Sequence, residues 1–152
     1  MGGKMGQEAG QQQDIEKRRI ERVEDMPIFQ AFFDLALGIE KNSLAFASDF
    51  RWLRAQMLRS SESVCANMTE GFYSQYSTEY LQALYRCRRE GRETATHLRY
   101  AMGVKQLSSE NGRVLIERYD QALMQLTNLI GSIERKIRHR GKAKSEAQSN
   151  SS

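Results

Sequence analysis

Few residues in this chain could do chemistry, and none of them forms a catalytic pattern. The only histidines are His97 and His139, and the only cysteines are Cys65 and Cys87. The sequence has no His-Glu-x-x-His pair, glycine-rich phosphate loop or Gly-x-Ser-x-Gly elbow, and it lacks the Glu-x-x-His pairs of di-iron bundles. The cysteines also lack the Cys-x-x-Cys spacing of metal sites. We therefore expect no enzyme, no cofactor and no metal site, and we expect both cysteines to be small buried thiols.

Glu70 is the one carboxylate that stands out, because helical spacing places it on the same face as Asn67 and Ser63. One interpretation makes it a ligand or an acid-base group. We favour the other, in which Glu70 is a buried hydrogen-bonding anchor, held by Arg59 or by another subunit, that fixes the register between helices.

The helix that carries Glu70 has two stripes. The apolar stripe contains Leu53, Met57, Val64 and Met68. The polar stripe contains Gln56, Ser60, Ser63, Asn67 and Glu70. A solvated face normally carries long Lys and Glu side chains, so these small and amide-bearing residues predict partly buried polar contacts between helices.

Basic residues are concentrated in two stretches, although the formal net charge is only +4. One stretch contains Arg86, Arg88, Arg89, Arg92 and Arg99, and the other contains Arg135, Lys136, Arg138, Arg140, Lys142 and Lys144. Such density suits an anionic partner, and we take the first nine of these residues, up to Arg140, as candidate nucleic-acid ligands. A solvated charged face is the alternative, and at this point it stays open.

Four helical segments follow from the apolar periodicity. They cover approximately residues 27–46, 50–72, 78–105 and 112–137. The last is the most regular, since its apolar residues recur at alternating spacings of three and four residues: Ile116, Tyr119, Leu123, Leu126, Ile130, Ile133 and Ile137. With short connections and no strand pattern, the sequence predicts an all-α, up-down-up-down four-helix bundle.

Several residues predict helix ends. Asp25, Asp49 and Ser77 have the side chains of N-caps, and a serine in the turn 108–112 caps the last helix. Gly71 suits a helix C-terminus in left-handed backbone conformation. Gly91 lies in an apolar seam, so we interpret it as a packing residue.

The bundle is expected to span residues 25–139. Residues 1–24 are expected to be disordered or partly helical and charged, and residues 140–152 to form a disordered basic and polar tail. No run of apolar residues is long enough to cross a membrane and no signal pattern is present, so we expect a cytoplasmic protein without a membrane partner.

The second helix resembles the central motif of the 23S ribosomal RNA intervening-sequence proteins, also called four-helix bundle proteins. The matching positions are Leu53, Gln56, Arg59, Ser63, Val64, Asn67, Met68, Glu70, Gly71 and Phe72. Weaker similarity extends over residues 25–137, and the chain departs from the family at Arg89 and Glu90, where Gly-Ser is usual. The resemblance implies a small basic bundle, often a pentamer, with no common enzymatic activity and with genes that can lie in ribosomal RNA insertions.

A sister group with the same fold is the accessory variability determinant of diversity-generating retroelements, which associates with a reverse transcriptase and its RNA. Two hypotheses about function result. The chain is a homo-oligomeric accessory module that binds RNA or DNA, with a reverse transcriptase as an alternative partner, or it is a structural or protein-interaction oligomer that binds no nucleic acid.

Overall fold

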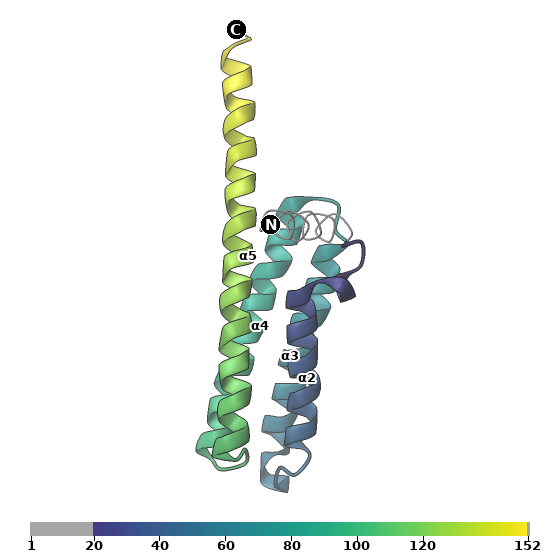
Figure 1. The fold of residues 1–152 in the computed structure, drawn as a ribbon, viewed down its shortest axis with the longest axis vertical. Helices are drawn as coiled ribbons and strands as arrows, with labels where there is room; N and C mark the ends of the chain where they lie inside the picture. Colours follow the sequence, from purple (N-terminus) through teal and green to yellow (C-terminus); the bar gives the residue numbers. More distant parts are fainter. Residues whose placement is uncertain (1–19, 152) are drawn as a thin grey trace, which may run out of the picture.

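The computed structural model describes residues 20–151, which contain four α-helices and no strand. The helices are α2 (Pro27–Ser43), α3 (Arg51–Phe72), α4 (Ser77–Gly103) and α5 (Ser109–Ser149). Two short 3-10 helices, η1 (Val23–Asp25) and η2 (Ser48–Phe50), precede α2 and α3. The predicted all-α class with four helices is therefore confirmed, and the four helices lie side by side in a bundle (Figure 1).

The core lies where the apolar stripes of the four helices meet. Helix α3 packs against α2 and α4, and α5 packs against the same two helices, so each helix has two neighbours. The largest fully buried side chains come from all four: Phe32, Ile39, Leu53, Met57, Val64, Met68, Leu84, Leu98, Tyr119, Leu126 and Ile130. Burying a side chain of this size contributes about 1.5–3 kcal/mol, so these contacts hold the helices in one arrangement.

The predicted seam of the third helix is confirmed. Cys87, Gly91 and Thr94 of α4 are all buried, and both cysteines are free thiols inside the bundle. Burial raises the pKa of each thiol to about 12, so neither is a reactive thiolate at neutral pH. A Cβ on Gly91 would lie 2.7 Å from Leu123 Cδ2, which confirms the role of this glycine in packing α4 against α5.

Of the four N-caps predicted from the sequence, one is confirmed and three are wrong. Ser108 caps α5, since its hydroxyl accepts a hydrogen bond of 3.1 Å from the Asn111 amide. The predicted caps Asp25, Asp49 and Ser77 are wrong, because the N-cap residues of α2, α3 and α4 are Met26, Phe50 and Tyr76. The 3-10 turns η1 and η2 take up Asp25 and Asp49, and α4 already includes Ser77 as its first residue.

Gly71 does not end α3 in a left-handed conformation. The helix continues to Phe72, and no glycine among the described residues has positive φ. The residue is needed for a different reason. A Cβ at Gly71 would lie 2.5 Å from Ala83 Cβ, so the missing side chain lets α3 approach α4.

The ends of the bundle also differ from the prediction. Helix α5 continues to Ser149, through most of the segment 140–152 that we expected to be disordered (Figure 1). This segment lacks proline and contains Lys, Ala, Glu and Gln, which favour a helix, and extending an existing helix avoids the cost of nucleation. At the other end Val23 is buried, so the bundle begins before residue 25. Residues 1–19 of the predicted segment 1–24 lie outside the described residues.

Candidate nucleic-acid interface

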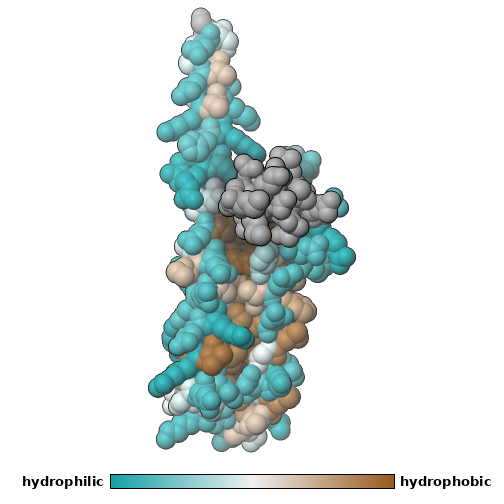
Figure 2. Space-filling view, in the orientation of Figure 1, coloured by the Kyte–Doolittle hydropathy of each residue, from teal (hydrophilic) through white to brown (hydrophobic). Residues whose placement is uncertain are grey.

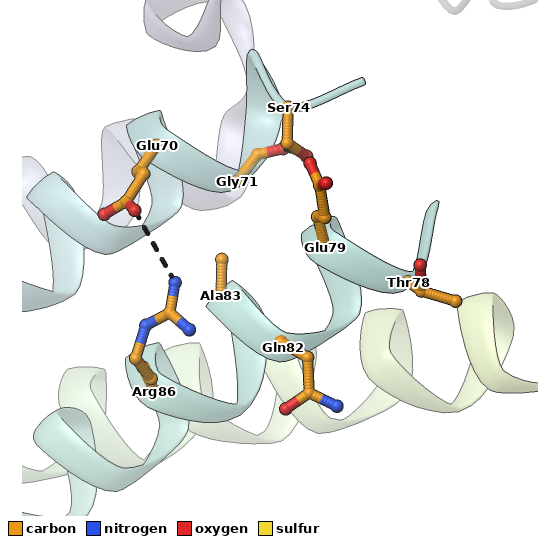
Figure 3. Close-up of a pocket in the computed structure, with 8 residues that line it drawn as sticks. All are labelled: Glu70, Gly71, Ser74, Thr78, Glu79, Gln82, Ala83 and Arg86. Carbon is orange, nitrogen blue, oxygen red and sulfur yellow. Dashed lines mark hydrogen bonds and ion pairs between the residues drawn. The ribbon is translucent and has the colours of Figure 1, made fainter. Parts of the chain in front are cut away.

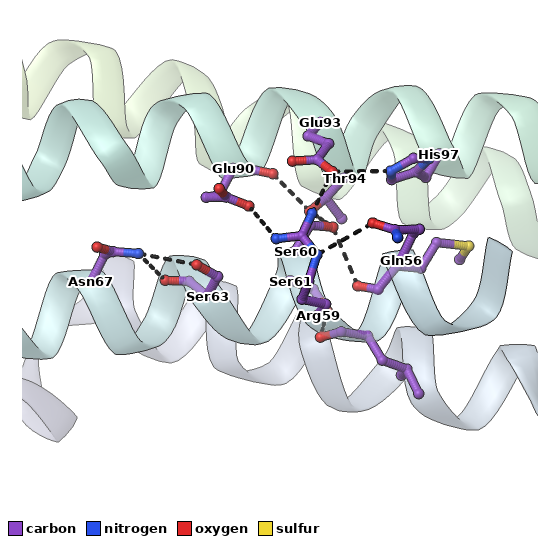
Figure 4. A network of polar contacts seen from close by, with 12 residues as sticks. Gln56, Arg59, Ser60, Ser61, Ser63, Asn67, Glu90, Glu93, Thr94 and His97 are labelled. Atoms are coloured by element: carbon purple, nitrogen blue, oxygen red, sulfur yellow. Dashed lines mark hydrogen bonds and ion pairs between the residues drawn. The ribbon is translucent and has the colours of Figure 1, made fainter. Parts of the chain in front are cut away.

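The polar stripe of α3 faces α4 along the seam between the two helices (Figure 4). At its centre the hydroxyls of Ser60 and Thr94 are fully buried and form a hydrogen bond of 2.7 Å. A buried hydroxyl without a partner would cost about 1–3 kcal/mol, and here the two groups satisfy each other. This part of the stripe is the buried polar contact between helices that the sequence predicts.

Arg59 forms the outer layer of the same seam (Figure 4). Its guanidinium lies 3.2 Å from Glu90 and 2.5 Å from Glu93 of α4, and its Nε donates to Gln56 Oε1 at 3.3 Å. His97 lies 3.4 Å from Glu93. Glu93 was not singled out from the sequence, and Glu90 only as a departure from the family, although their spacing of three places both on one face of α4. Glu90, a departure from the family pattern, therefore compensates the charge of Arg59.

The pKa of Glu93 shows that this contact favours its charged form. Partial burial alone would raise that pKa, but the hydrogen bonds from Arg59 and His97 outweigh burial, and the net shift is downward.

A prediction about acid stability follows. Because the folded pKa of Glu93 is depressed, its contribution is present above the unfolded pKa of a glutamate and is lost as pH falls through the folded value. The variant Arg59→Gln should lose about 0.2–1 kcal/mol at neutral pH, since the groups are partly exposed. Urea unfolding at neutral and acidic pH should show this difference shrinking in acid. A difference that stays constant would contradict an electrostatic origin.

Near the C-terminal end of α3 the polar stripe contacts the basic residue Arg86 of α4. The Asn67 amide donates to the Ser63 carbonyl at 2.8 Å, and Arg86 Nε donates to Asn67 Oδ1 at 3.0 Å. Arg86 also lies 3.9 Å from Glu70, whose side chain is 74% exposed. The interpretation of Glu70 as a buried anchor held by Arg59 within the chain is therefore wrong, because its partner is Arg86 and it faces solvent.

Glu70 and Arg86 line a hollow of about 410 Å³ between the end of α3 and the start of α4 (Figure 3). Its other lining side chains include Ser74, Thr78 and Glu79. Two carboxylates and one cation give this hollow no excess of positive charge, so it is a poor site for a phosphate.

The remaining arginines of α4 do not form a single face. Arg99 is paired with Asp120 of α5 at 2.6 Å, whereas Arg86 points to α3. The Arg88 guanidinium lies over the Tyr85 ring, 5.5 Å from its centroid. Arg89 and Arg92 are exposed and make no ion pair within residues 20–151. The prediction of one basic cluster on α4 thus reduces to two or three available cations.

The basic residues of α5 are different, because they follow one another along its C-terminal part, which passes the start of α4 before the end of the helix projects beyond the bundle (Figures 1 and 2). The exposed cations are Arg135, Lys136, Arg138, Arg140, Lys142 and Lys144. Among the described residues none of them makes an ion pair, and Arg140 makes one weak hydrogen bond, 3.4 Å, to Ser77. Lys142 and Lys144 belong to this surface only because α5 continues past residue 140.

A family model supports the resemblance found in the motif of α3. The model described as 23S rRNA-intervening sequence protein matches residues 24–128. The chain belongs to this family. A search of curated proteins finds no match.

The family match covers the polar seam and all the arginines of α4, and it ends before Arg135. The basic C-terminal part of α5 is therefore a feature of this chain outside the matched region. In the described part of the chain, no helix is long and apolar enough to cross a membrane, and no group of three metal-ligating side chains comes together.

Proposed function

We propose that this protein is a non-enzymatic, RNA-binding accessory protein that acts in the cytoplasm. The observation that carries the proposal is the basic C-terminal part of α5, defined by Arg135, Lys136, Arg138, Arg140, Lys142 and Lys144. No acidic residue interrupts these six cations, and helix α5 presents all of them to solvent. Hereafter we call this surface the basic end of α5.

Two physical arguments support a polyanion as the partner. Ile137 is the apolar side chain of this segment that packs against the core, and the six cations around it are exposed, so their charges are available for a partner. Each phosphate that a Lys or Arg neutralises releases condensed counterions, which makes several adjacent cations a strong attractor for nucleic acid. We take RNA as the first polyanion to test, because the family to which the chain belongs is described by its association with an intervening sequence of 23S rRNA.

We further propose that the up-down-up-down bundle assembles into a homo-oligomer, a pentamer if it follows the family that it resembles. An oligomer would place several basic ends on one RNA, and linked weak contacts raise the overall affinity strongly. Oligomer formation and RNA binding are separate claims, and each has its own test below.

The RNA prediction concerns the charge of the basic end. The triple variant Arg135→Gln, Arg138→Gln, Arg140→Gln should bind a fluorescein-labelled RNA hairpin about tenfold more weakly, or worse, at low salt. The slope of log K against log salt should become shallower by about 2–3, because three phosphate contacts are lost. Fluorescence anisotropy over a salt series measures both quantities.

A matched control removes the same charge from other exposed positions. The variant Lys41→Gln, Arg113→Gln, Arg118→Gln changes the net charge equally and should keep most of the affinity. An equal loss of affinity in the two triple variants would mean that RNA binding depends only on the net charge of the protein. Absence of RNA binding by the unmodified protein at low salt would overturn the proposal and leave the structural or protein-interaction oligomer as the better function.

A reverse transcriptase remains an alternative partner. It rests on the resemblance to the accessory proteins of diversity-generating retroelements, which stays a prediction. Binding that requires the polymerase together with RNA, and not RNA alone, would favour it.

A further inference from the structure

An apolar groove runs along the outside of α2 and α3. It has a volume of about 490 Å³, and its apolar lining includes Phe33 and Leu37 of α2, which are 46% and 57% exposed, and Leu58 of α3. A neighbouring hollow shares Phe29 and Phe33 with this groove. Apolar surface is visible over α2 in Figure 2. The breadth of the apolar face of α2 thus exceeds what the core of one chain covers.

The charged residues that line the groove and the neighbouring hollow are all carboxylates: Glu24, Asp34, Glu40 and Glu62. Glu24 and Glu40 have cationic partners in Arg22 and Arg54. Asp34 and Glu62 make no ion pair within residues 20–151. In a protein of net positive charge, this is an acidic rim around an apolar floor.

A surface of the opposite character lies on the other side of α3. Trp52 of α3 and Tyr100 of α4 are 52% and 48% exposed, and their ring centroids lie 5.8 Å apart. Arg51, which precedes Trp52, is exposed and makes no ion pair among the described residues. We call Trp52 and Tyr100 the aromatic pair. It is a half-exposed aromatic surface, and the cation Arg51 lies next to it in the chain.

We propose that copies of this chain assemble head to tail, with the aromatic pair of one copy inserted into the apolar groove of the next. This inference rests on the proposed homo-oligomer and names the surfaces that form it. Charge complementarity supports a second copy as the occupant, because Arg51 would meet the unpaired carboxylates Asp34 and Glu62. Trp and Tyr are also the residues that most often dominate binding energy at interfaces.

The positions of the two surfaces determine the kind of assembly. The groove lies between α3 and α2, and the aromatic pair lies between α3 and α4. The aromatic pair of one copy therefore cannot enter the groove of the same copy. Contacts between two different surfaces are heterologous, and they propagate into a closed ring when the rotation between neighbours allows closure. Each copy then uses both surfaces.

The first test uses the single tryptophan of the chain as a reporter. In the assembled protein Trp52 should be buried, so its fluorescence emission should shift to longer wavelength when dilution separates the copies. The variants Trp52→Glu and Leu37→Glu should each reduce the mass measured by light scattering to that of a monomer. Both positions are more than half exposed, so the substitutions should leave the fold intact by circular dichroism. The matched control Val114→Glu, at an apolar position that is 50% exposed, should keep the mass of the unmodified protein.

The decisive test mixes the two monomeric variants. Trp52→Glu keeps an intact groove and Leu37→Glu keeps an intact aromatic pair, so the mixture should form a one-to-one heterodimer that cannot grow further. Two monomers that fail to pair would overturn the head-to-tail arrangement. An oligomer that persists in both single variants would overturn the choice of surfaces while the proposed oligomer stands. A monomeric unmodified protein would overturn both, and RNA binding by the basic end would still be tested separately.

Discussion

The variant Tyr119→Ala is expected to lose about 3–5 kcal/mol of folding free energy. Tyr119 is fully buried in the N-terminal third of α5, and its ring packs edge to face against Phe32 of α2 at a centroid distance of 5.5 Å. On its other side the ring lies near Gly91 of α4, where a Cβ would be 3.7 Å from Tyr119 Cε1. The side chain therefore joins three helices, and its removal would leave a cavity that none of them can close alone.

The matched variant Tyr119→Phe separates the ring from its hydroxyl. The hydroxyl is buried without a hydrogen-bond partner of good geometry among the described residues, and burial raises its pKa. Removing an unsatisfied polar group costs little, so Tyr119→Phe should lie within about 1 kcal/mol of the unmodified protein or exceed its stability.

Urea unfolding of the unmodified protein and the two Tyr119 variants measures both effects. A loss of several kcal/mol in Tyr119→Phe would show instead that the hydroxyl makes a strong hydrogen bond, with the nearby Thr94 as its partner. A small loss in Tyr119→Ala would mean that the three helices can close around the vacated volume.

The fold was predictable because apolar spacing is a local property of each helix. The repeat through Ile116, Tyr119 and Leu126 identifies the buried face of α5 without reference to any other element. The end of α5 was not predictable in the same way, because a polar helix past residue 140 has no apolar stripe. Its helicity depends on propensity and on continuity with the packed part of the helix.

The contacts across the α3 and α4 seam were predictable only in part. The small and amide-bearing residues of α3 indicated a polar seam, and the Ser60 to Thr94 hydrogen bond confirms it. The partners of Arg59 could not be predicted, because they depend on the register between two helices. That register is determined by packing over the whole interface rather than by local sequence.

The arginines of α4 show a second limit of prediction from sequence, because residues that are close in the chain need not share one face of a helix. Each residue advances a helix by about 100°, so Arg86 and Arg88, two positions apart, are separated by about 200° and point to opposite sides. Arg86 is engaged by Asn67 and Glu70, whereas Arg88 lies over Tyr85. The density of arginines along the sequence therefore overestimated how many of them are available to a partner on α4. The cations of the basic end of α5 are less restricted, because none of them makes an ion pair among the described residues, although Arg140 and Lys144 lie beside the start of α4.

Gly71 gives the second large expected effect. Alanine normally stabilises a helix interior relative to glycine by about 0.5–1 kcal/mol. At Gly71 the added Cβ would lie 2.5 Å from Ala83 Cβ and 3.1 Å from Tyr80 Cδ2, distances that require α3 and α4 to separate. Neither contact can be relieved by rotating a flexible chain end. Gly71→Ala should therefore lose about 1–3 kcal/mol despite its better helix propensity.

Gly38 of α2 provides the opposite case. A Cβ at this position would meet only Leu115 Cδ2 at 3.5 Å, an ordinary contact, so Gly38→Ala should gain about 0.5–1 kcal/mol. Urea midpoints with unchanged m values should move in opposite directions for the two variants. A stabilised Gly71→Ala variant would show that α3 and α4 do not approach as closely as their backbones indicate. A destabilised one would assign this glycine of the family motif to helix packing, independently of any ligand in the adjacent hollow.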